Sequence, residues 1–272
     1  MPLISVITAA YAPSADYLVD TAHSIEALDV PAGWEVEWIV QEDGEVPRLA
    51  GTLRPFAFCD YSAIGRQLGI AYTRNLALSR ARGVLLQALD QDDLLLPNAL
   101  TTLIPHFDER AIHWAIGQAD DLMPDGSRKA YPSPIPFGLR AAGSINDWAA
   151  QNGGNWPIHG AALMMRTASF RALGGWTGIP SDDELATFSA LSQMADGYYD
   201  EKLTWLYRHH PKQTHRTEMA QALSESGRRI ALQRALAVNE VGLNLSRDSG
   251  TGFANQSISV EVGANIKDTG QL

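Results

Sequence analysis

The feature that most constrains the fold is a short apolar run that stops at a cluster of acids. Residues 84–89 are almost continuously hydrophobic, and Asp90, Asp92 and Asp93 follow directly. A run of this length is typical of a strand that is buried on both faces, as in a parallel sheet covered by helices on each side. The acids at its end predict a polar edge of that sheet.

The chain on either side of this run alternates between strand and helix patterns. Strands are predicted at residues 3–8, 34–40 and 55–60, and helices at 14–28, at 66–80 and after Pro97. This alternation predicts an α/β fold with a mostly parallel central sheet flanked by helices.

Polar residues lie at the ends of three predicted strands. Thr8 ends the first, Asp43 follows the second, and residues 90–93 follow the buried run. Ligands of such sheets bind outside the carboxyl ends of the strands. We therefore expect three separate pieces of chain to converge on one crevice.

The second half of the chain is less regular. It predicts strands at residues 112–118 and 161–166, and helices at 167–173, 181–192 and 219–238. We expect a single domain with two lobes, at residues 1–96 and 97–240. Residues 241–272, rich in Ser, Asn and Gly, are expected to be a weakly structured tail.

Composition and charge exclude several classes of function. The formal net charge of −10 argues against binding to nucleic acid, which relies on Lys and Arg. No apolar run approaches the length of a membrane helix, so no integral membrane segment is expected. The single cysteine, Cys59, excludes an intramolecular disulfide, and no signal-peptide pattern opens the chain. A cytoplasmic location is therefore expected.

The acids after the buried run are the sharpest chemical signal, since P-loop, dinucleotide, α/β-hydrolase and zincin motifs are all absent. Carboxylates there are hard oxygen ligands. They predict Mn²⁺ or Mg²⁺, which would bridge to a diphosphate. The alternative is an acidic loop that caps the helix near Pro97.

Seven short segments occur in an order and spacing that is more specific than any one of them. They are residues 4–11 (ISVITAAY), 38–44 (WIVQEDG), 71–75 (AYTRN), 81–83 (ARG), 89–93 (LDQDD), 173–176 (LGGW) and 181–183 (SDD). Together they resemble the family 2 glycosyltransferases of the GT-A fold, which are inverting enzymes that use nucleotide sugars. The resemblance extends from Ile4 to about Thr217. It implies that residues 1–96 form a nucleotide-sugar-binding lobe and residues 97–240 an acceptor-binding lobe.

The resemblance implies roles for individual residues. Asp93 would ligate the metal, with Asp92 also contacting the ribose. The loop at Asp43 departs from the family pattern, because Glu45 stands where a serine is usual. The nucleotide-binding residues implied are Thr8, Ala9, Ala10, Tyr11, Asp43, Arg74, Asp90 and Asp92.

Asp182 and Asp183 resemble the acidic pair that carries the catalytic base of the family. An inverting transfer needs one carboxylate to take the proton of the acceptor hydroxyl, and a neighbouring carboxylate raises the proton affinity of that base. We favour Asp183 over Asp182. The alternative is that both acids only stabilise the start of a helix.

Residues 207–216 form a basic, histidine-rich segment in an acidic chain. It resembles the family loop that closes over the diphosphate, with Gln213 and Arg216 as candidate lid residues. His209 or His210 could complete the metal site. A solvated basic loop is the alternative for this segment. His159 and Trp156 are weaker candidates for contact with the acceptor, since either could be structural.

The sequence thus predicts a metal-dependent inverting glycosyltransferase that moves a sugar from a nucleotide diphosphate sugar, with UDP favoured, to a hydroxyl of a small-molecule or glycan acceptor. Two alternatives stay open, namely a sugar nucleotidyltransferase and a non-catalytic nucleotide-sugar-binding protein on the same scaffold. The oligomeric state also stays open, a homodimer included.

Overall fold

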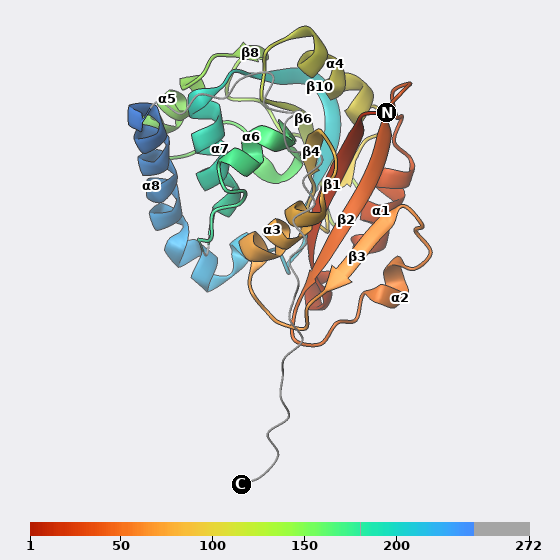
Figure 1. Ribbon diagram of the computed structural model, residues 1–272. Coiled ribbons are helices and arrows are strands. Elements are labelled where there is room, and N and C mark those ends of the chain that lie inside the picture. The colour runs from red at the N-terminus through yellow and green to blue at the C-terminus, as the bar shows by residue number, and fades with distance from the viewer. Residues whose placement is uncertain (180, 242–272) are drawn as a thin grey trace, which may run out of the picture.

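Parallel strands from the first third of the chain form one half of the sheet. The computed structural model describes residues 1–179 and 181–241, and Figure 1 shows these strands side by side. Their order is β3 (Cys59–Ala63), β2 (Glu35–Asp43), β1 (Leu3–Tyr11) and β4 (Leu85–Ala88), and every pairing among them is parallel. The apolar run at residues 84–89 thus forms the predicted buried strand.

The other half of the sheet begins with a strand of opposite direction. β9 (Met164–Arg166) lies antiparallel between β4 and β6 (Trp114–Leu122), and β10 (Gly197–Arg208) is parallel to β6. The edge strand β5 (Leu94–Leu95) pairs with β10. β7 (Arg128–Ala130) pairs with β6, and β8 (Gly138–Arg140) pairs with β10. One continuous sheet therefore runs through both predicted lobes, and the expected α/β fold is confirmed.

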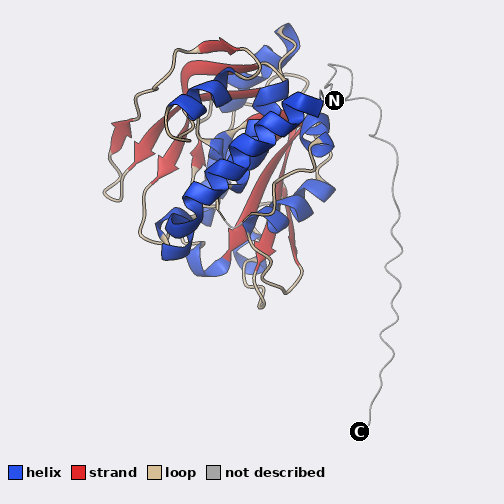
Figure 2. Cartoon of the chain, turned by 90° about the vertical axis from the view of Figure 1, so that its left-hand side faces the viewer, coloured by secondary structure: helices blue, strands red, loops and turns tan. Residues whose placement is uncertain are grey.

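Helices cover the faces of this sheet. They are α1 (Leu18–Glu26), α2 (Ala50–Leu53), α3 (Ile70–Arg80), α4 (Ala99–Glu109), α5 (Ser144–Gln151), α6 (Thr167–Ala172), α7 (Asp183–Met194) and α8 (Glu218–Val241). Short 3₁₀ helices lie at Ala12–Ser14, Gly160–Ala162 and Thr214–Arg216. Figure 2 shows α8 as a long helix along the outside of the molecule. It packs mainly against α7.

Several predicted elements begin later in the structure than in the sequence analysis, among them α1, at Leu18 instead of residue 14, and β9, at Met164 instead of residue 161. The third strand occupies Cys59–Ala63 instead of residues 55–60, and α3 begins at Ile70 instead of residue 66. Gly69, just before α3, has a φ of 84°, a left-handed conformation that glycine adopts readily. That conformation keeps residues 66–69 out of the helix, so they form a loop.

The core is built on the strands and is rich in large side chains. Trp38, Trp114 and Trp205, from β2, β6 and β10, are fully buried. Within residues 1–179 and 181–241, no helix combines the length and the apolar character needed to cross a bilayer. The predicted tail, apart from Val241, lies outside the described residues.

Candidate active site

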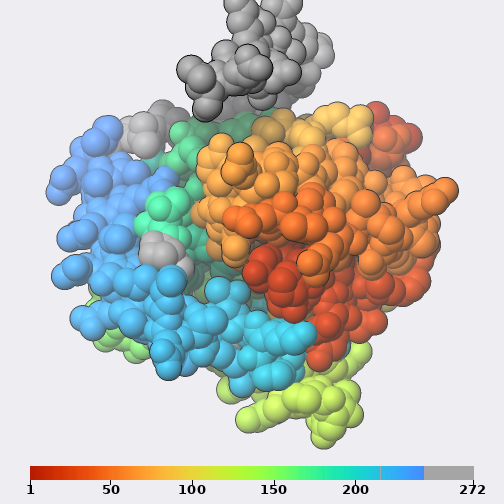
Figure 3. All heavy atoms as spheres, turned by 90° about the horizontal axis from the view of Figure 1, so that it is seen from below, coloured from red at the N-terminus to blue at the C-terminus, as the bar shows by residue number. Residues whose placement is uncertain are grey.

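The carboxyl ends of β1, β2 and β4 meet at one edge of the sheet, as the sequence predicts. Tyr11 at the end of β1 is in register with Asp43 at the end of β2. The amide of Leu89, just past β4, donates to the carbonyl of Ile7. Figure 3 looks onto this edge, where segments from the two ends of the described chain lie side by side.

A hollow of about 230 Å³ lies at the ends of β1 and β2. It is lined by Tyr11, Ala12, Pro13, Asp43, Gly44, Glu45, Val46, Arg48 and Gln67. The Asp43 carboxylate accepts two backbone hydrogen bonds, from Leu68 N at 2.6 Å and Gly69 N at 3.1 Å. It therefore fixes the loop before α3 as one wall of the hollow. Sequence reasoning assigned no role to that loop.

The candidate residues of the first loop differ in their access to the hollow. Thr8 is fully buried, and its hydroxyl donates to Leu89 O (2.9 Å) and accepts from the Trp38 indole (3.0 Å). Ala10 is also buried, whereas Ala9 is half-buried and Tyr11 is exposed. Thr8 and Ala10 thus support the loop from beneath, and Tyr11 offers surface to a ligand.

A buried arginine joins the acids after β4 to the acids of α7. Arg74, on α3, is 2% exposed. Its guanidinium contacts Asp90, Asp183 Oδ2 at 3.1 Å and Glu184 Oε1 at 2.5 Å. The guanidinium also lies 5.8 Å from the ring centroid of Trp176. One cation therefore faces three carboxylates from two distant parts of the chain.

Burial changes the proton affinity of these acids. Desolvation raises the pKa of Asp90 to about 7 and that of Asp183 to about 6, although Arg74 opposes both shifts. Burial also acts on Glu184, but there Arg74 and His159 prevail and lower its pKa. Asp183 is thus poised to exchange a proton near neutral pH, while Glu184 stays ionised.

The side chains of Asp182 and Asp183 point in different directions. It is the N-cap of α7, and its carboxylate accepts a hydrogen bond from Ser181 Oγ at 3.0 Å. An atom in the Cβ position of Gly227, on α8, would lie 3.1 Å from Asp182 Oδ2. Asp182 therefore faces α8, whereas Asp183 faces Arg74.

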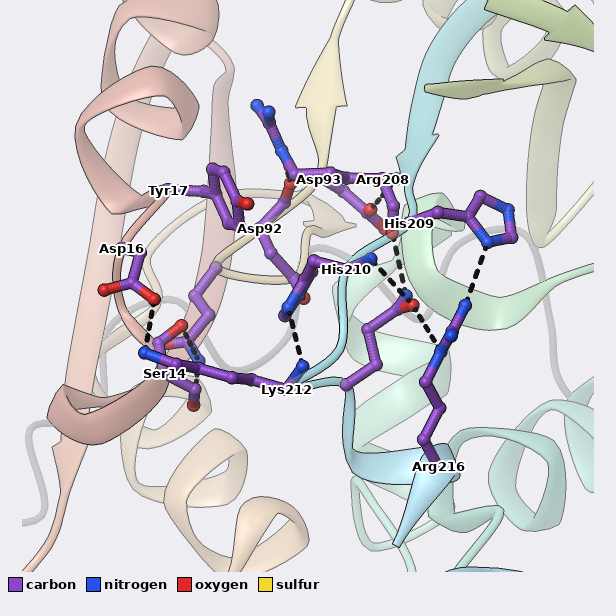
Figure 4. A network of polar contacts seen from close by, with 12 residues as sticks. Ser14, Asp16, Tyr17, Asp92, Asp93, Arg208, His209, His210, Lys212 and Arg216 are labelled. Carbon is purple, nitrogen blue, oxygen red and sulfur yellow. Dashed lines mark hydrogen bonds and ion pairs between the residues drawn. The ribbon is translucent and has the colours of Figure 1, made fainter. Parts of the chain in front are cut away.

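The acids after β4 lie close together and, with His210, form a candidate cation site. One oxygen from each of Asp90, Asp92 and Asp93 lies within 4.8 Å of the others. Asp93 is 1% exposed, and its Oδ1 accepts from Arg208 N at 2.8 Å. Its buried Oδ2 has no hydrogen-bond partner within the described part of the chain. His210 Nε2 lies 2.5 Å from Asp92 Oδ2 (Figure 4).

The tautomer of His210 follows from its second contact. Lys212 N donates to His210 Nδ1 at 3.2 Å, so Nδ1 acts as the acceptor. The proton of the neutral ring is then on Nε2, directed at Asp92. His210 therefore orients Asp92 in this structure.

The segment after β10 is tied across the site to the start of α1 (Figure 4). Arg208 Nε donates to Asp92 O at 2.7 Å, and its guanidinium lies 4.2 Å from the ring centroid of Tyr17. Lys212 Nζ contacts Asp16 Oδ2 at 2.6 Å. These contacts hold the segment over the acids after β4.

The candidate lid residues brace this segment from within. Gln213 Oε1 accepts from His210 N and from Arg216 Nε, each at 3.2 Å. His209 points away from the acids, with its Nε2 3.0 Å from Asp121 Oδ1. Of the two candidate histidines, only His210 lies beside the acids after β4.

The acceptor candidates occupy different places. His159 lies beside the acids of α7, because a Cβ on the adjacent Gly160 would come within 2.9 Å of Glu184 Cβ. Its ring centroid is 4.7 Å from that of Tyr207. The residue keeps exposed surface, yet the protein atoms crowding its ring lower its pKa. Trp156 instead donates from Nε1 to Asn146 Oδ1 on α5, at 3.2 Å.

Several residues of the site escaped sequence reasoning. Gln91 accepts from Tyr11 N at 2.8 Å and so ties the first loop to the acids after β4. Glu184, Asp16, Tyr17 and Lys212 also contact the site, as described above. Gln91 and Lys212 carried a signal because they lie in segments that the sequence analysis singled out, and Glu184 because it directly follows the two candidate base residues. Asp16 and Tyr17 carried none.

Comparisons with known proteins agree with the resemblance. The model of glycosyl transferase family 2 matches residues 5–174. The uncharacterised protein y4gI of Sinorhizobium fredii is 26% identical in an alignment of 246 residues that covers 87% of this chain. The chain spans only 26% of the length of that relative.

Solved structures of S. aureus TarS share the fold at 16% sequence identity. The crystal structure of its residues 1–349 in complex with UDP-GlcNAc superposes with a TM-score of 0.66, over 92% of this chain and 69% of that one. The structure of the same fragment with UDP gives a TM-score of 0.63, over 92% and 68%.

Proposed function

Because this chain belongs to glycosyl transferase family 2, we propose that it transfers a glycosyl group from a nucleotide diphosphate sugar to a hydroxyl group, with inversion at the anomeric carbon. UDP is the proposed nucleotide and a small or soluble molecule the proposed acceptor. The observation that carries the proposal is the meeting of the acids after β4 with the acids of α7 at the buried Arg74. An inverting transfer needs both groups within one site.

The hollow at the ends of β1 and β2 is the proposed site of the nucleotide base. Tyr11 is exposed at its wall, and an aromatic ring there can stack on a base. The acids after β4 lie next to it along the sheet edge, since Gln91 bonds to Tyr11. The diphosphate would therefore lie beside Asp92 and Asp93, with residues 1–96 serving the donor and 97–240 the acceptor.

The residues after β4 fit a divalent cation. They offer hard carboxylate oxygens, and the buried Asp93 Oδ2 lacks a partner in the described residues. Asp93 and Asp92 would hold Mn²⁺ or Mg²⁺, and His210 could join them only by giving up its Nε2 proton. When bound, the cation neutralises negative charge on the leaving diphosphate.

Asp183 is the proposed catalytic base. The acceptor oxygen forms a bond to the anomeric carbon, the bond from that carbon to the diphosphate breaks, and Asp183 takes the hydroxyl proton. A pKa of about 6 suits this role, because the carboxylate is mostly ionised at neutral pH and still has appreciable proton affinity. Arg74 holds the carboxylate in place.

The experiment that tests the proposal has two stages. The first stage is a screen of nucleotide sugars in the presence of Mn²⁺. The donor is the nucleotide sugar that raises the melting temperature of the protein and is hydrolysed by it. Asp183→Asn should then retain donor affinity while transfer falls by about 100- to 10,000-fold.

A matched control is Asp147→Asn, which removes an exposed acid from the first turn of α5. If acids at these positions only stabilise helix starts, both variants will keep their activity. Activity like that of the parent in Asp183→Asn would remove this residue from the mechanism.

A further inference from the structure

The turn before α7 has an unusual backbone conformation. Asp182 has a φ of 58° and a ψ of 31°, and among the residues that the structure describes it is the only one other than glycine with a positive φ. This left-handed conformation costs a residue with a Cβ free energy, so neighbouring structure must enforce it. The residue that follows, Asp183, begins the helix and contacts Arg74.

The enforcing neighbour is α8. Gly227 is buried where α8 crosses the turn, and an atom in its Cβ position would lie 2.7 Å from Ser181 O. The same atom would lie 3.1 Å from Asp182 Oδ2 and 3.3 Å from Asp182 Cβ. Since 2.7 Å is too close for a carbon and a backbone oxygen, only glycine fits here without moving the turn.

The rest of α8 is anchored, so the helix cannot easily retreat from the turn. Ser189 Oγ on α7 donates to Ala231 O at 2.8 Å, and Arg234 Nη2 donates to Leu173 O at 2.6 Å. Ala231 and Ala235 continue the small, buried face that Gly227 begins. A side chain added at position 227 would therefore push on the turn.

We propose that Gly227 and Asp182 are positioning residues, which together hold the turn at Ser181 so that Asp183 and Glu184 point at Arg74. The proposal rests on the proposed function for its catalytic consequence. The proposal also goes beyond the proposed function, because it gives α8 a role in the geometry of the site. α8 lies outside the part of the chain that the family model matches.

The test is Gly227→Ala, with Ser226→Ala as the matched control on the same helix. We expect Gly227→Ala to lower kcat by about 100-fold, as misplacement of a catalytic group by about 1 Å can do. The affinity for UDP should stay within about twofold of the parent, since the hollow for the base lies elsewhere. At an unconstrained position, alanine would instead raise the melting temperature through its higher helix propensity.

A second pair of variants covers the case in which Gly227→Ala does not fold. Asn tolerates the left-handed conformation and can still accept the hydrogen bond from Ser181, whereas Ala can do neither. Asp182→Ala should therefore lose about tenfold more kcat than Asp182→Asn. Equal losses in the two variants, or an unchanged kcat in folded Gly227→Ala, would overturn the proposal.

Hydrogen exchange of residues 181–187 separates this proposal from the proposed function. We expect these amides to exchange faster in Gly227→Ala than in Ser226→Ala, whether or not the parent transfers a sugar. A parent without transfer activity would refute the function alone, and unchanged exchange would refute the positioning role.

Discussion

Replacement of Arg74 by methionine is the most demanding test of the buried charge cluster. Methionine fills a similar volume but leaves Asp90, Asp183 and Glu184 without their shared cation. Removing one partner of a buried ion pair typically costs about 3–5 kcal/mol. The Arg74 side chain is 3% exposed and those of its partners are 8–28% exposed, so water can restore little of the loss.

The expected loss can be measured by thermal and urea unfolding. For a chain of this length, about 3–5 kcal/mol corresponds to a fall in melting temperature of about 6–20 °C. The control is Lys212→Met, which breaks an ion pair with Asp16 in which the two side chains are 52% and 58% exposed. Pairs of that kind are worth less than about 1 kcal/mol.

The loss of unfolding free energy in Arg74→Met, here called the deficit, should also depend on pH in a defined direction. Arg74 lowers the pKa of Asp90 and of Asp183, so its removal raises both values further above those of the unfolded chain. The folded variant then binds more protons than the unfolded one, and its stability falls as the pH rises. The deficit relative to the parent should therefore be larger at about pH 8 than at about pH 5.

Two outcomes would refute this reasoning. Arg74→Met could prove as stable as Lys212→Met, which would mean that the cluster is well solvated. Alternatively, the deficit could be the same at both pH values, which would mean that the carboxylates do not take up protons to compensate.

Three further outcomes are expected. Transfer by the parent should fall as the pH is lowered through about 6, because Asp183 becomes protonated; a rate that is constant between about pH 5 and 7 would contradict its role as base. EDTA should abolish transfer. In calorimetry, Asp93→Ala should weaken Mn²⁺-dependent UDP binding by at least about tenfold. Equal UDP affinity in the parent and in Asp93→Ala would exclude a metal at Asp93. Lys212→Ala should change the stability by less than about 1 kcal/mol in urea unfolding, because its contact with Asp16 is half exposed, and a larger loss would show that the tie to α1 supports the fold.

The predictable parts of the fold are those that local patterns determine. The buried run ending at Asp90 indicated a covered strand, and polar residues at strand ends indicated where the chain would converge. Both expectations hold in the structure, because parallel strands in register bring their carboxyl ends to one edge. The start of α3 was misplaced because helical spacing cannot reveal the left-handed Gly69.

The remaining features depend on contacts between distant residues. Nothing local indicates that β9 inserts antiparallel between β4 and β6, or that two residues after the acids form β5. The pairing of Arg74 with Asp183 spans 109 positions and arises only when the fold brings the start of α7 to α3. Sequence reasoning could therefore identify the candidate acids, and Arg74 as a candidate nucleotide-binding residue, but not that Arg74 joins the two groups of acids.

The bond from Arg208 N to Asp93 has a consequence for the order in which the protein matures. Among the strands that the structure describes, β5 pairs only with β10, which ends at Arg208. The neighbourhood of the acids after β4 is therefore completed more than a hundred residues later in the chain. A nascent chain that has not yet emerged past β10 has its acids but not their final surroundings. Closing so long a loop is slow, so these contacts should form late in folding. Metal-dependent nucleotide binding would then report the completed fold, and its onset during refolding would mark the last step of assembly.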